Sequence, residues 1–431
     1  MAWSGGGGMV ETADIAVIGG GMVGLASALA LQERRLDVVL CDPGEARART
    51  SFGNAGVISR GSILPMASPA LWGKLPAYLR NADRALRLDY THLPRIIPYL
   101  AHFLAAARET RWREAAASLL PLTSAAYAAH ERLAARAGTT DRLARTGWIK
   151  AYRTEDAFAG AALERDILER HGVAFEILDG DALREREPAL VRRYARAMLL
   201  TETGSVREPG RLIEACEALY AQTGGRRIRS TVTRLTPDGD GWVLAYEGGT
   251  LWAKQVVLAA GAASGVLARE LGYRFALAAE RGYHRHYALH PDSPPLSRPV
   301  LDTGAASIIA PMGPDRVRVL SGVELNARHA APNHGQIEAA SREAADTLRL
   351  GGPLDNEPWL GSRPSTPDGM PVIGRAPRHR GLIFAFGHGH IGLSTGPVTG
   401  EIVADLATGR EPAVPIAPFA PQRLLGFPRL I

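Results

Sequence analysis

The sequence has only two cysteines, and this shortage excludes several classes of protein. Cys41 and Cys216 are too few for a disulfide framework in 431 residues, and no His or Cys spacing fits a metal site, so we expect no metal. Cys41 falls in an apolar strand pattern and Cys216 in a helical one, which favours buried free thiols. This usage is typical of a reducing compartment, and we expect the protein to be cytoplasmic.

Lysine is also scarce. Lys74, Lys150 and Lys254 are the only lysines, so arginine supplies nearly all of the positive charge behind the formal net charge of +6. The arginines are scattered, usually beside Asp or Glu, and the longest basic runs are short (Arg192–Arg193 and Arg226–Arg227). A nucleic-acid-binding protein would gather this charge in one patch or stripe. The pattern therefore predicts an ion-paired surface and no nucleic-acid partner.

Signal-peptide and membrane-span patterns are missing as well. Residues 1–12 lack a charged n-region and an apolar h-region, and their glycine run predicts a flexible leader. Ile15–Leu31 is apolar, but its four glycines between Gly19 and Gly24 predict a strand, a turn and a helix instead of a span. Leu93–Ala107 is apolar but contains two prolines, an arginine and a histidine. We expect a core-packed helix there, with a peripheral contact to the inner face of a membrane as the alternative.

The strongest local motif is the G-x-G-x-x-G run from Gly19 to Gly24, between a predicted strand (Ile15–Ile18) and a predicted helix (Met22–Gln32). Its first glycine permits a tight turn, its second lets the backbone approach a pyrophosphate, and its third lets the helix pack on the strand. The helix N-terminus then offers N–H groups and a positive partial charge to the phosphates. With Val38–Cys41 as a second strand, the segment predicts a dinucleotide-binding β-α-β unit.

The choice of dinucleotide depends on three other segments. Asp42, at the end of the second strand, is placed to accept the adenosine ribose hydroxyls, which favours FAD or NAD over NADP. Val256–Ala262 is an apolar strand that ends in small residues, which would admit a second part of the cofactor, although any buried strand before a turn has this pattern. Phe386–Gly392 joins a strand to a helix through glycines that suit a flat ring, and the helix N-terminus would stabilise negative charge on a reduced flavin. An NAD enzyme would leave the last two segments without a purpose, so FAD is favoured.

Two more runs complete a resemblance to a known family. Ser51–Gly56 and Arg363–Asp368, the latter followed by Pro371–Gly374, stand in the same order as motifs of the D-amino-acid oxidase superfamily. From about residue 13 to 425 the chain resembles FAD-dependent D-amino acid dehydrogenases of the small-subunit type. Glu280–His284 and Ala385–His390 look like the glyphosate oxidoreductase branch, which is close to the D-hydroxyproline dehydrogenases.

The resemblance implies a non-covalent FAD, because both cysteines lie far along the chain from the flavin-edge motifs. The cofactor contacts that it implies, together with those of the glycine motif, are Gly19, Gly21, Met22, Val23, Gly24, Asp42, Pro43, Ser51, Asn54, Ala55, Gly56, Val232, Ala260, Gly261, Gly387, His388, Gly389, Gly392, Leu393 and Ser394.

For the substrate, the resemblance points first to Arg363, which matches the arginine that grips the substrate carboxylate in glycine-oxidase-like relatives. A guanidinium fork holds a carboxylate bidentately and so fixes which face of Cα meets the flavin. The alternative is a surface arginine before a proline turn. Tyr283 and His284 are further candidates for the carboxylate or amine, with outward residues on a strand as the alternative. His388 is an assisting candidate, although it and His390 also fit loop histidines or an incomplete metal pair.

The order of the elements predicts an α/β protein with a discontinuous Rossmann-like FAD-binding domain and an α+β substrate domain that contains an antiparallel sheet. The FAD-binding domain is expected over residues 13–92, 196–274 and 358–425, and the substrate domain over residues 93–195 and 275–357. Nothing in the sequence decides between a monomer, a homo-oligomer and a hetero-oligomer.

The expected function is oxidative deamination of a D-amino acid. Hydride would pass from Cα to the flavin, and water would hydrolyse the imine to a 2-oxo acid and ammonia. One alternative substrate is an N-substituted glycine or a cyclic imino acid, as in hydroxyproline-, sarcosine- or glyphosate-like oxidation. Another alternative is a flavin electron-transfer subunit without its own catalysis. The electron acceptor could be a quinone, the respiratory chain or oxygen.

Overall fold

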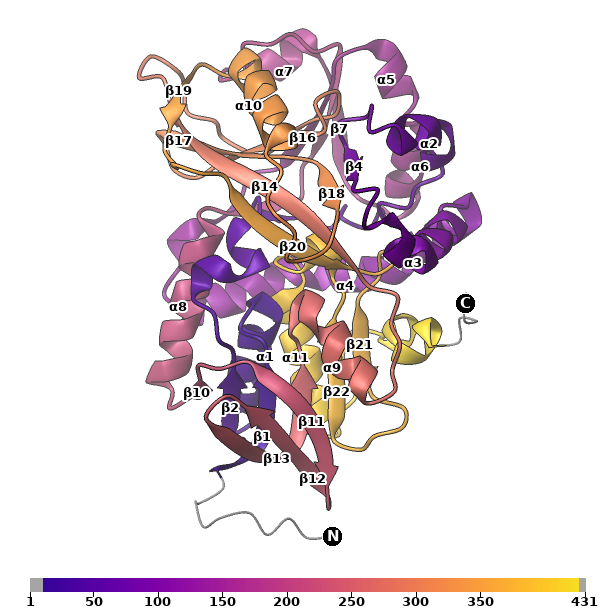
Figure 1. The fold of residues 1–431 in the computed structure, drawn as a ribbon. Helices are drawn as coiled ribbons and strands as arrows, with labels where there is room; N and C mark the ends of the chain where they lie inside the picture. The colour runs from indigo at the N-terminus through magenta and orange to yellow at the C-terminus, as the bar shows by residue number, and fades with distance from the viewer. Residues whose placement is uncertain (1–10, 426–431) are drawn as a thin grey trace.

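The predicted N-terminal strand–helix–strand unit is present in the computed structural model, which describes residues 11–425 (Figure 1). β1 (Glu11–Ile18) leads through the glycine turn into α1 (Met22–Glu33), and β2 (Val38–Cys41) then pairs with β1 in parallel. Alternation along β1 turns Ile15 and Val17 toward the core that holds α1. α1 is buried almost all round because helices cover it as well as the sheet.

Segments far apart in the sequence build the first sheet, in the lower half of Figure 1. β13 (Gly249–Leu258) lies parallel to β1 on one side and to β22 (Leu382–Phe386) on the other. The strand order is β10 (Arg226–Ile228), β2, β1, β13, β12 (Gly241–Tyr246) and β11 (Val232–Asp238), with β21 (Val372–Arg375) antiparallel to β22. The Rossmann-like unit is therefore discontinuous, as predicted.

A second, mostly antiparallel sheet forms the upper half (Figure 1). Its long central strand, β14 (Ala278–Leu289), pairs with β17 (Arg316–Leu320), β18 (Val323–Leu325), β19 (Leu350–Pro353) and β20 (Trp359–Ser365). The other strands of this large sheet are β4 (Leu86–Leu88), β6 (Trp148–Tyr152), β7 (Phe175–Asp179), β8 (Arg196–Leu200), β15 (Val300–Asp302) and β16 (Ser307–Pro311). A separate three-stranded sheet contains β3 (Val57–Ile58), β5 (Leu143–Arg145) and β9 (Gly204–Val206).

Helices cover both sheets, and one of them joins the halves. α4 (Glu109–Arg136) contributes Leu119 and Leu122 to a core that also contains Met198 of β8 and residues of α1. The remaining helices are α2 (Leu71–Leu79), α3 (Leu93–Ala106), α5 (Glu155–Ala159), α6 (Ala162–Arg170), α7 (Gly180–Arg186), α8 (Pro209–Gln222), α9 (Ser264–Glu270), α10 (Gly335–Thr347) and α11 (Gly396–Ala407). Within residues 11–425, no helix is both long and apolar enough to cross a bilayer.

Some strands fall outside the sheet that the predicted domain ranges imply. β4, β8 and β20 lie within the ranges expected for the FAD-binding domain, but all three pair in the large sheet. A short apolar run marks a strand without naming its partner, so the sequence could not predict these pairings. The domain ranges themselves stay a prediction. At the N-terminus, β1 begins at Glu11, so the last two residues of the expected leader are in a strand; residues 1–10 lie outside the described residues.

Glycine permits the close packing of α1 against α11. A Cβ atom on Gly400 would lie 2.5 Å from the carbonyl carbon of Ala26, and one on Gly396 would lie 2.5 Å from Cγ of Met22. Real Cβ atoms do not approach backbone this closely, so a side chain at residue 400 must push the two helices apart.

We expect Gly400→Ala to lower the melting temperature, because overpacking of a tight core costs about 1–3 kcal/mol. Gly73→Ala is the matched control, because residue 73 is helical in α2 and an added Cβ would meet nothing within 4 Å. That variant should melt at the wild-type temperature or slightly above it, since alanine is the better helix former. Equal melting temperatures for the two variants would contradict the packing argument.

Candidate active site

The glycine motif forms a cradle between β1 and α1. Gly19 has a φ of +108°, and a Cβ on Gly24 would lie 1.8 Å from the carbonyl oxygen of Gly19, so both positions require glycine. A Cβ on Gly21 would find its nearest neighbour, Oγ of Ser51, at 3.6 Å. Gly21 therefore faces open space at the N-terminus of α1, where no side chain caps the helix. The oriented N–H groups of this first turn fit a pyrophosphate.

Asp42 lies beside this cradle, at the end of β2, and its carboxylate already has hydrogen-bond and ion-pair partners within the protein. Its carboxylate accepts the N–H of Gly20 at 2.6 Å and pairs with Nη2 of Arg49 at 3.2 Å. Arg49 is 6% exposed and also pairs with Glu217 at 2.5 Å, and Arg227 contacts both acids. The ribose contact of Asp42 and the contact of Pro43 stay predictions. Arg49 and Glu217 were not expected at this end of the site.

The loop of residues 51–56 is tied to both halves of the molecule. Oγ of Ser51 accepts the N–H of Met22 at 3.2 Å, which attaches the loop to the start of α1. From β17, Nη1 of Arg318 donates to the carbonyl oxygens of Phe52 and Asn54 at 3.0 and 2.6 Å. The Asn54 side chain accepts the N–H of Gly56 at 2.9 Å. Arg318 was not predicted, because nothing in the sequence separates it from the many ion-paired arginines.

Two further segments carry predicted cofactor contacts: the start of β11 and the turn after β13. Val232 belongs to the same apolar cluster as Ile18 and Cys41, at the carboxyl ends of β1 and β2. Gly261 has a φ of +55°, and a Cβ there would meet nothing within 4 Å, so the turn after β13 has room around it. These contacts with a cofactor, and that of Ala260, stay predictions that the local geometry permits.

The loop after β22 is held rigidly against α4 and α11. Gly387 and Gly389 have φ values of +80° and +52°, which the turn requires. Nε2 of His130 on α4 donates to the carbonyl oxygen of Leu393 at 3.0 Å. The hydroxyl of Ser394 is buried without a hydrogen-bond partner among the described residues. An unsatisfied buried hydroxyl at this loop fits a bound group that would supply its partner.

Pairing between β14 and β20 builds the other wall of the site. Glu280 stands opposite Arg363, Gly282 opposite Gly361, and His284 opposite Trp359. Because side chains alternate along a strand, these residues share one face of the sheet. The guanidinium of Arg363 lies flat against Gly282, where an added Cβ would be 2.6 Å from Nη2.

Arg363 has no counter-ion in contact with it. Among residues 11–425 it forms no side-chain hydrogen bond and no ion pair. It is partly exposed, yet enough protein surrounds it that desolvation lowers its pKa, and the negative charge of Glu280 opposes this effect. An unpaired guanidinium fork in such surroundings has the charge and geometry to fit a carboxylate, and the carboxylate contact of Arg363 stays a prediction.

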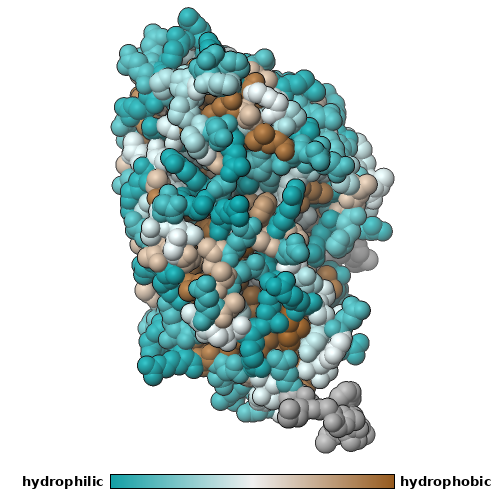
Figure 2. All heavy atoms as spheres, turned by 90° about the vertical axis from the view of Figure 1, so that its left-hand side faces the viewer, coloured by the Kyte–Doolittle hydropathy of each residue, from teal (hydrophilic) through white to brown (hydrophobic). Residues whose placement is uncertain are grey.

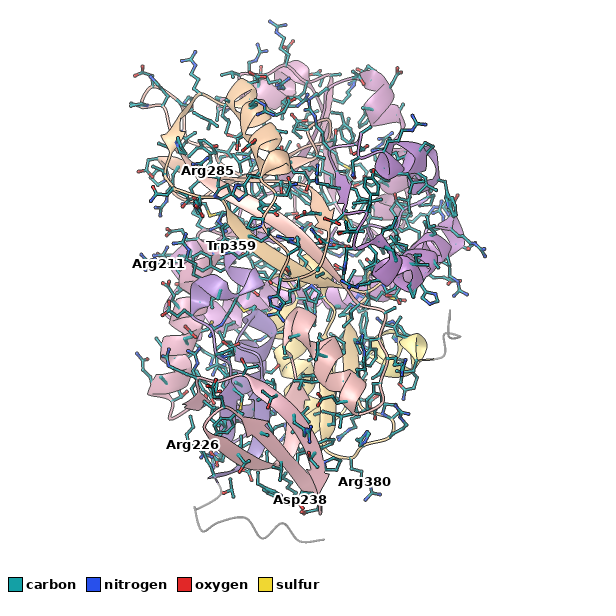
Figure 3. All side chains as sticks on the ribbon, in the orientation of Figure 1. Arg211, Arg226, Asp238, Arg285, Trp359 and Arg380 are labelled. Carbon is teal, nitrogen blue, oxygen red and sulfur yellow. The ribbon has the colours of Figure 1, made fainter. Side chains whose placement is uncertain are left out.

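His284 is on the same face but is packed between rings. Its ring stacks on Trp359 with a centroid distance of 4.7 Å, and Figure 3 shows Trp359 on β20 where the large sheet meets the lower half. Burial and the positive charge of Arg318 lower the pKa of His284 well below its usual value, so the ring is neutral. A Cβ on Gly53 would lie 2.0 Å from the Trp359 ring. His284 and Trp359 thus join the large sheet to the loop of residues 51–56.

The structure does not bring two predicted catalytic residues to Arg363. Tyr283 is on the opposite face of β14, where its hydroxyl donates to Glu324 at 2.7 Å and accepts the N–H of Asn333 at 2.9 Å. His388 is 2% exposed, and its Nε2 hydrogen-bonds Oγ1 of Thr399 in α11 at 3.1 Å. Burial lowers the pKa of His388 to about 3, so it is neutral. Both side chains thus have hydrogen-bond partners within the protein, and their catalytic roles stay predictions. Strand alternation could have given the face of Tyr283, whereas the direction of His388 depends on the loop.

A cavity lies between the loop after β22 and the ends of β14 and β20. It is lined by Glu280, Ser365, Gly389 and His390, with Met66 and Phe103 on another side. The His390 side chain is exposed, but the surrounding protein lowers its pKa to about 4, and the positive charges of Arg363 and Lys150 act in the same direction. Glu280 and Ser365 were not predicted as site residues, although both flank Arg363 in the register.

Comparison with known proteins shows the family. A family model described as FAD dependent oxidoreductase, DAO, matches residues 14–406. The chain belongs to the DAO family. It is similar to a D-amino-acid oxidase of Bradyrhizobium diazoefficiens, with 34% identity over 97% of this chain and 100% of the relative. It is also similar to a D-amino acid dehydrogenase of a Methylobacterium species, with 30% identity over 95% of this chain and 98% of the relative.

Solved structures agree with the fold. Glycine oxidase from Geobacillus kaustophilus has a TM-score of 0.78 and 25% identity, and the match covers 96% of this chain and 100% of that one. Iminodiacetate oxidase from Chelativorans has a TM-score of 0.71 at 18% identity over 94% of this chain and 98% of that one, which shows the fold alone. This DAO-family protein is thus an FAD-dependent oxidoreductase, and the cradle around Gly21 fits the cofactor of the family.

The cysteines favour a non-covalent attachment of FAD. Cys41 is 1% exposed in β2 and Cys216 is 0% exposed in α8, and burial raises the pKa of both thiols to about 12. A buried neutral thiol is a poor nucleophile. Acid precipitation of the yellow protein should therefore release all of its FAD into the supernatant. Flavin absorbance that stays with the washed, denatured chain would contradict this prediction.

Proposed function

We propose that this protein oxidises the Cα–N bond of a D-amino acid and yields a 2-oxo acid and ammonia. The observation that carries the proposal is the unpaired guanidinium of Arg363, which lies flat on Gly282. Its strand partner Glu280 lines a cavity that the loop after β22 also lines. The names of the two relatives, a D-amino-acid oxidase and a D-amino acid dehydrogenase, support the choice of substrate.

The chain's own residues bind and orient the substrate. Arg363 takes the carboxylate in a bidentate grip, which leaves Cα and its substituents at fixed positions relative to the β22 loop. Gly282 supports the flat guanidinium, and the packed rings of His284 and Trp359 fix the sheet beneath it. When bound, FAD accepts the hydride from Cα. His388 and His390 are neutral, so they carry no positive charge that would repel the positive charge that develops on the substrate as hydride leaves.

An N-substituted glycine or a cyclic imino acid is the second candidate substrate. Glycine oxidase and iminodiacetate oxidase share the fold, and a carboxylate receptor serves all of these compounds equally well. A purely electron-transferring role is disfavoured, because an unpaired arginine at the cavity would then have no ligand.

Arg363→Ala should lower kcat/KM for amino acids by an amount equivalent to about 3–5 kcal/mol, because it leaves the substrate carboxylate unpaired. FAD content and the flavin spectrum should stay normal. Arg363→Lys should recover only part of the loss, because an ammonium cannot reproduce the fork.

Gly282→Ala tests the same contact from the other strand. Its Cβ would displace the guanidinium, so KM should rise while FAD is retained. Gly352→Ala is the matched control, since a Cβ there meets nothing within 4 Å. Normal turnover by a stable Arg363→Ala protein would rule out the carboxylate grip.

We also propose that the protein docks on anionic membrane lipid through α2 and α3. Large apolar side chains that are about half exposed gather between residues 66 and 97, namely Met66, Trp72, Leu79, Tyr90 and Ile97. The nearby Lys74, Arg80 and Arg95 are exposed and would meet anionic headgroups. Figure 2 views the side away from α2 and α3 and shows a mostly hydrophilic face with small, separate apolar patches. Met66 also lines the active-site cavity, so this docking favours a membrane-dissolved quinone as electron acceptor.

Flotation with vesicles tests the docking. The holoenzyme should bind vesicles that contain an anionic lipid and bind neutral vesicles weakly, with less binding at high salt. Replacing Trp72 and Ile97 by serine should abolish binding without changing turnover with a soluble dye as acceptor. Binding that is unaffected by this double change would contradict the proposal.

A further inference from the structure

Glu280 is a carboxylic acid buried in the wall of the cavity, and the carboxylate grip does not use it. It is 6% exposed, lines the cavity with Ser365 and His390, and stands directly opposite Arg363 in the strand register. The Tyr99 hydroxyl from α3 donates to its Oε1 at 3.3 Å. A buried acid is costly to keep unless a partner compensates for the loss of water.

Arg363 does not compensate the cost of burying the Glu280 carboxylate by direct contact. No ion pair joins the two side chains among the described residues, although their charges influence each other. The Ser365 hydroxyl, on the same strand face as Arg363, is buried and lowers the pKa of Glu280 as a hydrogen-bonding neighbour. One face of the β14–β20 pair therefore carries the positive Arg363 and the acidic Glu280 as neighbours, and neither charged group neutralises the other at contact distance.

This arrangement is complementary to the two charges of a free amino acid. The carboxylate and the ammonium are attached to one Cα, so their receptors must be close neighbours on one surface. Directly opposed residues of an antiparallel pair have Cβ atoms about 4.5–5.5 Å apart, which is the right scale for this head group. Glu280 and Arg363 are such a pair.

We propose that Glu280 is the receptor for the substrate's amino group and takes its proton before oxidation. The inference rests on the proposed function and adds the amine subsite to it. The substrate enters as a zwitterion, with its carboxylate on Arg363 and its ammonium on Glu280. A proton passes from nitrogen to a Glu280 oxygen, which frees the nitrogen lone pair. As the hydrogen of Cα passes with its bonding electron pair to FAD, the oxidant of the family, the nitrogen lone pair forms the C=N bond. Water then adds to the iminium carbon, and loss of ammonia leaves the 2-oxo acid.

The electrostatics of Glu280 suit this proton transfer. Desolvation raises its pKa above the ordinary value, and Ser365, Arg363 and Tyr99 oppose part of the increase. A carboxylate with a raised pKa is a better proton acceptor than an exposed one. Because only the ionised form can hold an ammonium, activity should fall as the pH drops through this raised pKa.

The decisive experiment compares two ligands that differ only in the amine. Binding of D-alanine and of propionate to the holoenzyme is followed by the change in the flavin spectrum, anaerobically and with reduction resolved in time. Glu280→Gln should lower the affinity for D-alanine at least about tenfold, which is the worth of a charge-assisted hydrogen bond, and should leave the affinity for propionate almost unchanged. Glu280→Asp should restore part of the binding, and the acidic limb of the pH profile for flavin reduction should disappear in Glu280→Gln.

Controls separate this inference from the proposed function. Glu357→Gln makes the same change of charge at an exposed residue that precedes β20, and it should leave both ligands unaffected. Arg363→Lys should lower the affinity for D-alanine and for propionate together. If Glu280→Gln weakened propionate as much as D-alanine, Glu280 would act only by placing Arg363, and the amine subsite would be refuted. If wild-type protein bound propionate but no amino acid reduced its flavin, the proposed function would fail, while the binding comparison would still decide the role of Glu280.

Discussion

The positive charge of Arg363 is the constraint on which the rest of the site depends. A guanidinium that is surrounded by protein and has no contacting counter-ion is expensive to hold, so the fold must fix it from several sides. Gly282 leaves room for its flat face, and the β14–β20 register sets Glu280 opposite to it. The charge is left unpaired within the described residues, and in the proposed function a substrate carboxylate supplies its partner. Binding energy that would otherwise stabilise the fold is thereby reserved for the ligand.

The site lies where two sheets meet, and a small number of polar contacts hold them in place. Arg318 reaches from the large sheet to the backbone of the loop of residues 51–56, and the same loop is attached through Ser51 to the start of α1. The Trp359 ring lies over Gly53, while His130 of α4 fixes the flavin-edge loop. A shift of either sheet would therefore disturb the phosphate cradle and the carboxylate receptor together. This coupling explains why residues distant in sequence must be placed as one unit.

The sequence was most informative where glycine or register leaves no choice. The motifs predicted the turn at Gly19, the cradle at Gly21 and the strand position of Arg363. A tight turn and a close approach of the backbone both require glycine, and the arginine has a fixed place in its motif. Tyr283 and His388 were candidates because of the family resemblance, but strand alternation turns the first away from Arg363 and the loop turns the second toward Thr399. Glu280, Arg318 and Arg49 could not be found this way, since their roles depend on partners from distant strands and loops. For the same reason the sequence could not predict that β4, β8 and β20 pair in the large sheet.

The central claim is that the cavity oxidises an amino acid whose carboxylate Arg363 holds. Anaerobic mixing of the holoenzyme with a panel of D-, L- and N-alkyl amino acids, with flavin bleaching as the signal, tests it most directly. We expect fast and complete bleaching by D-amino acids, slow bleaching by their L-forms, and almost none with the methyl esters of the same compounds, which lack the carboxylate charge. Bleaching by the esters as fast as by the free acids, or no bleaching by any member of the panel, would contradict the account.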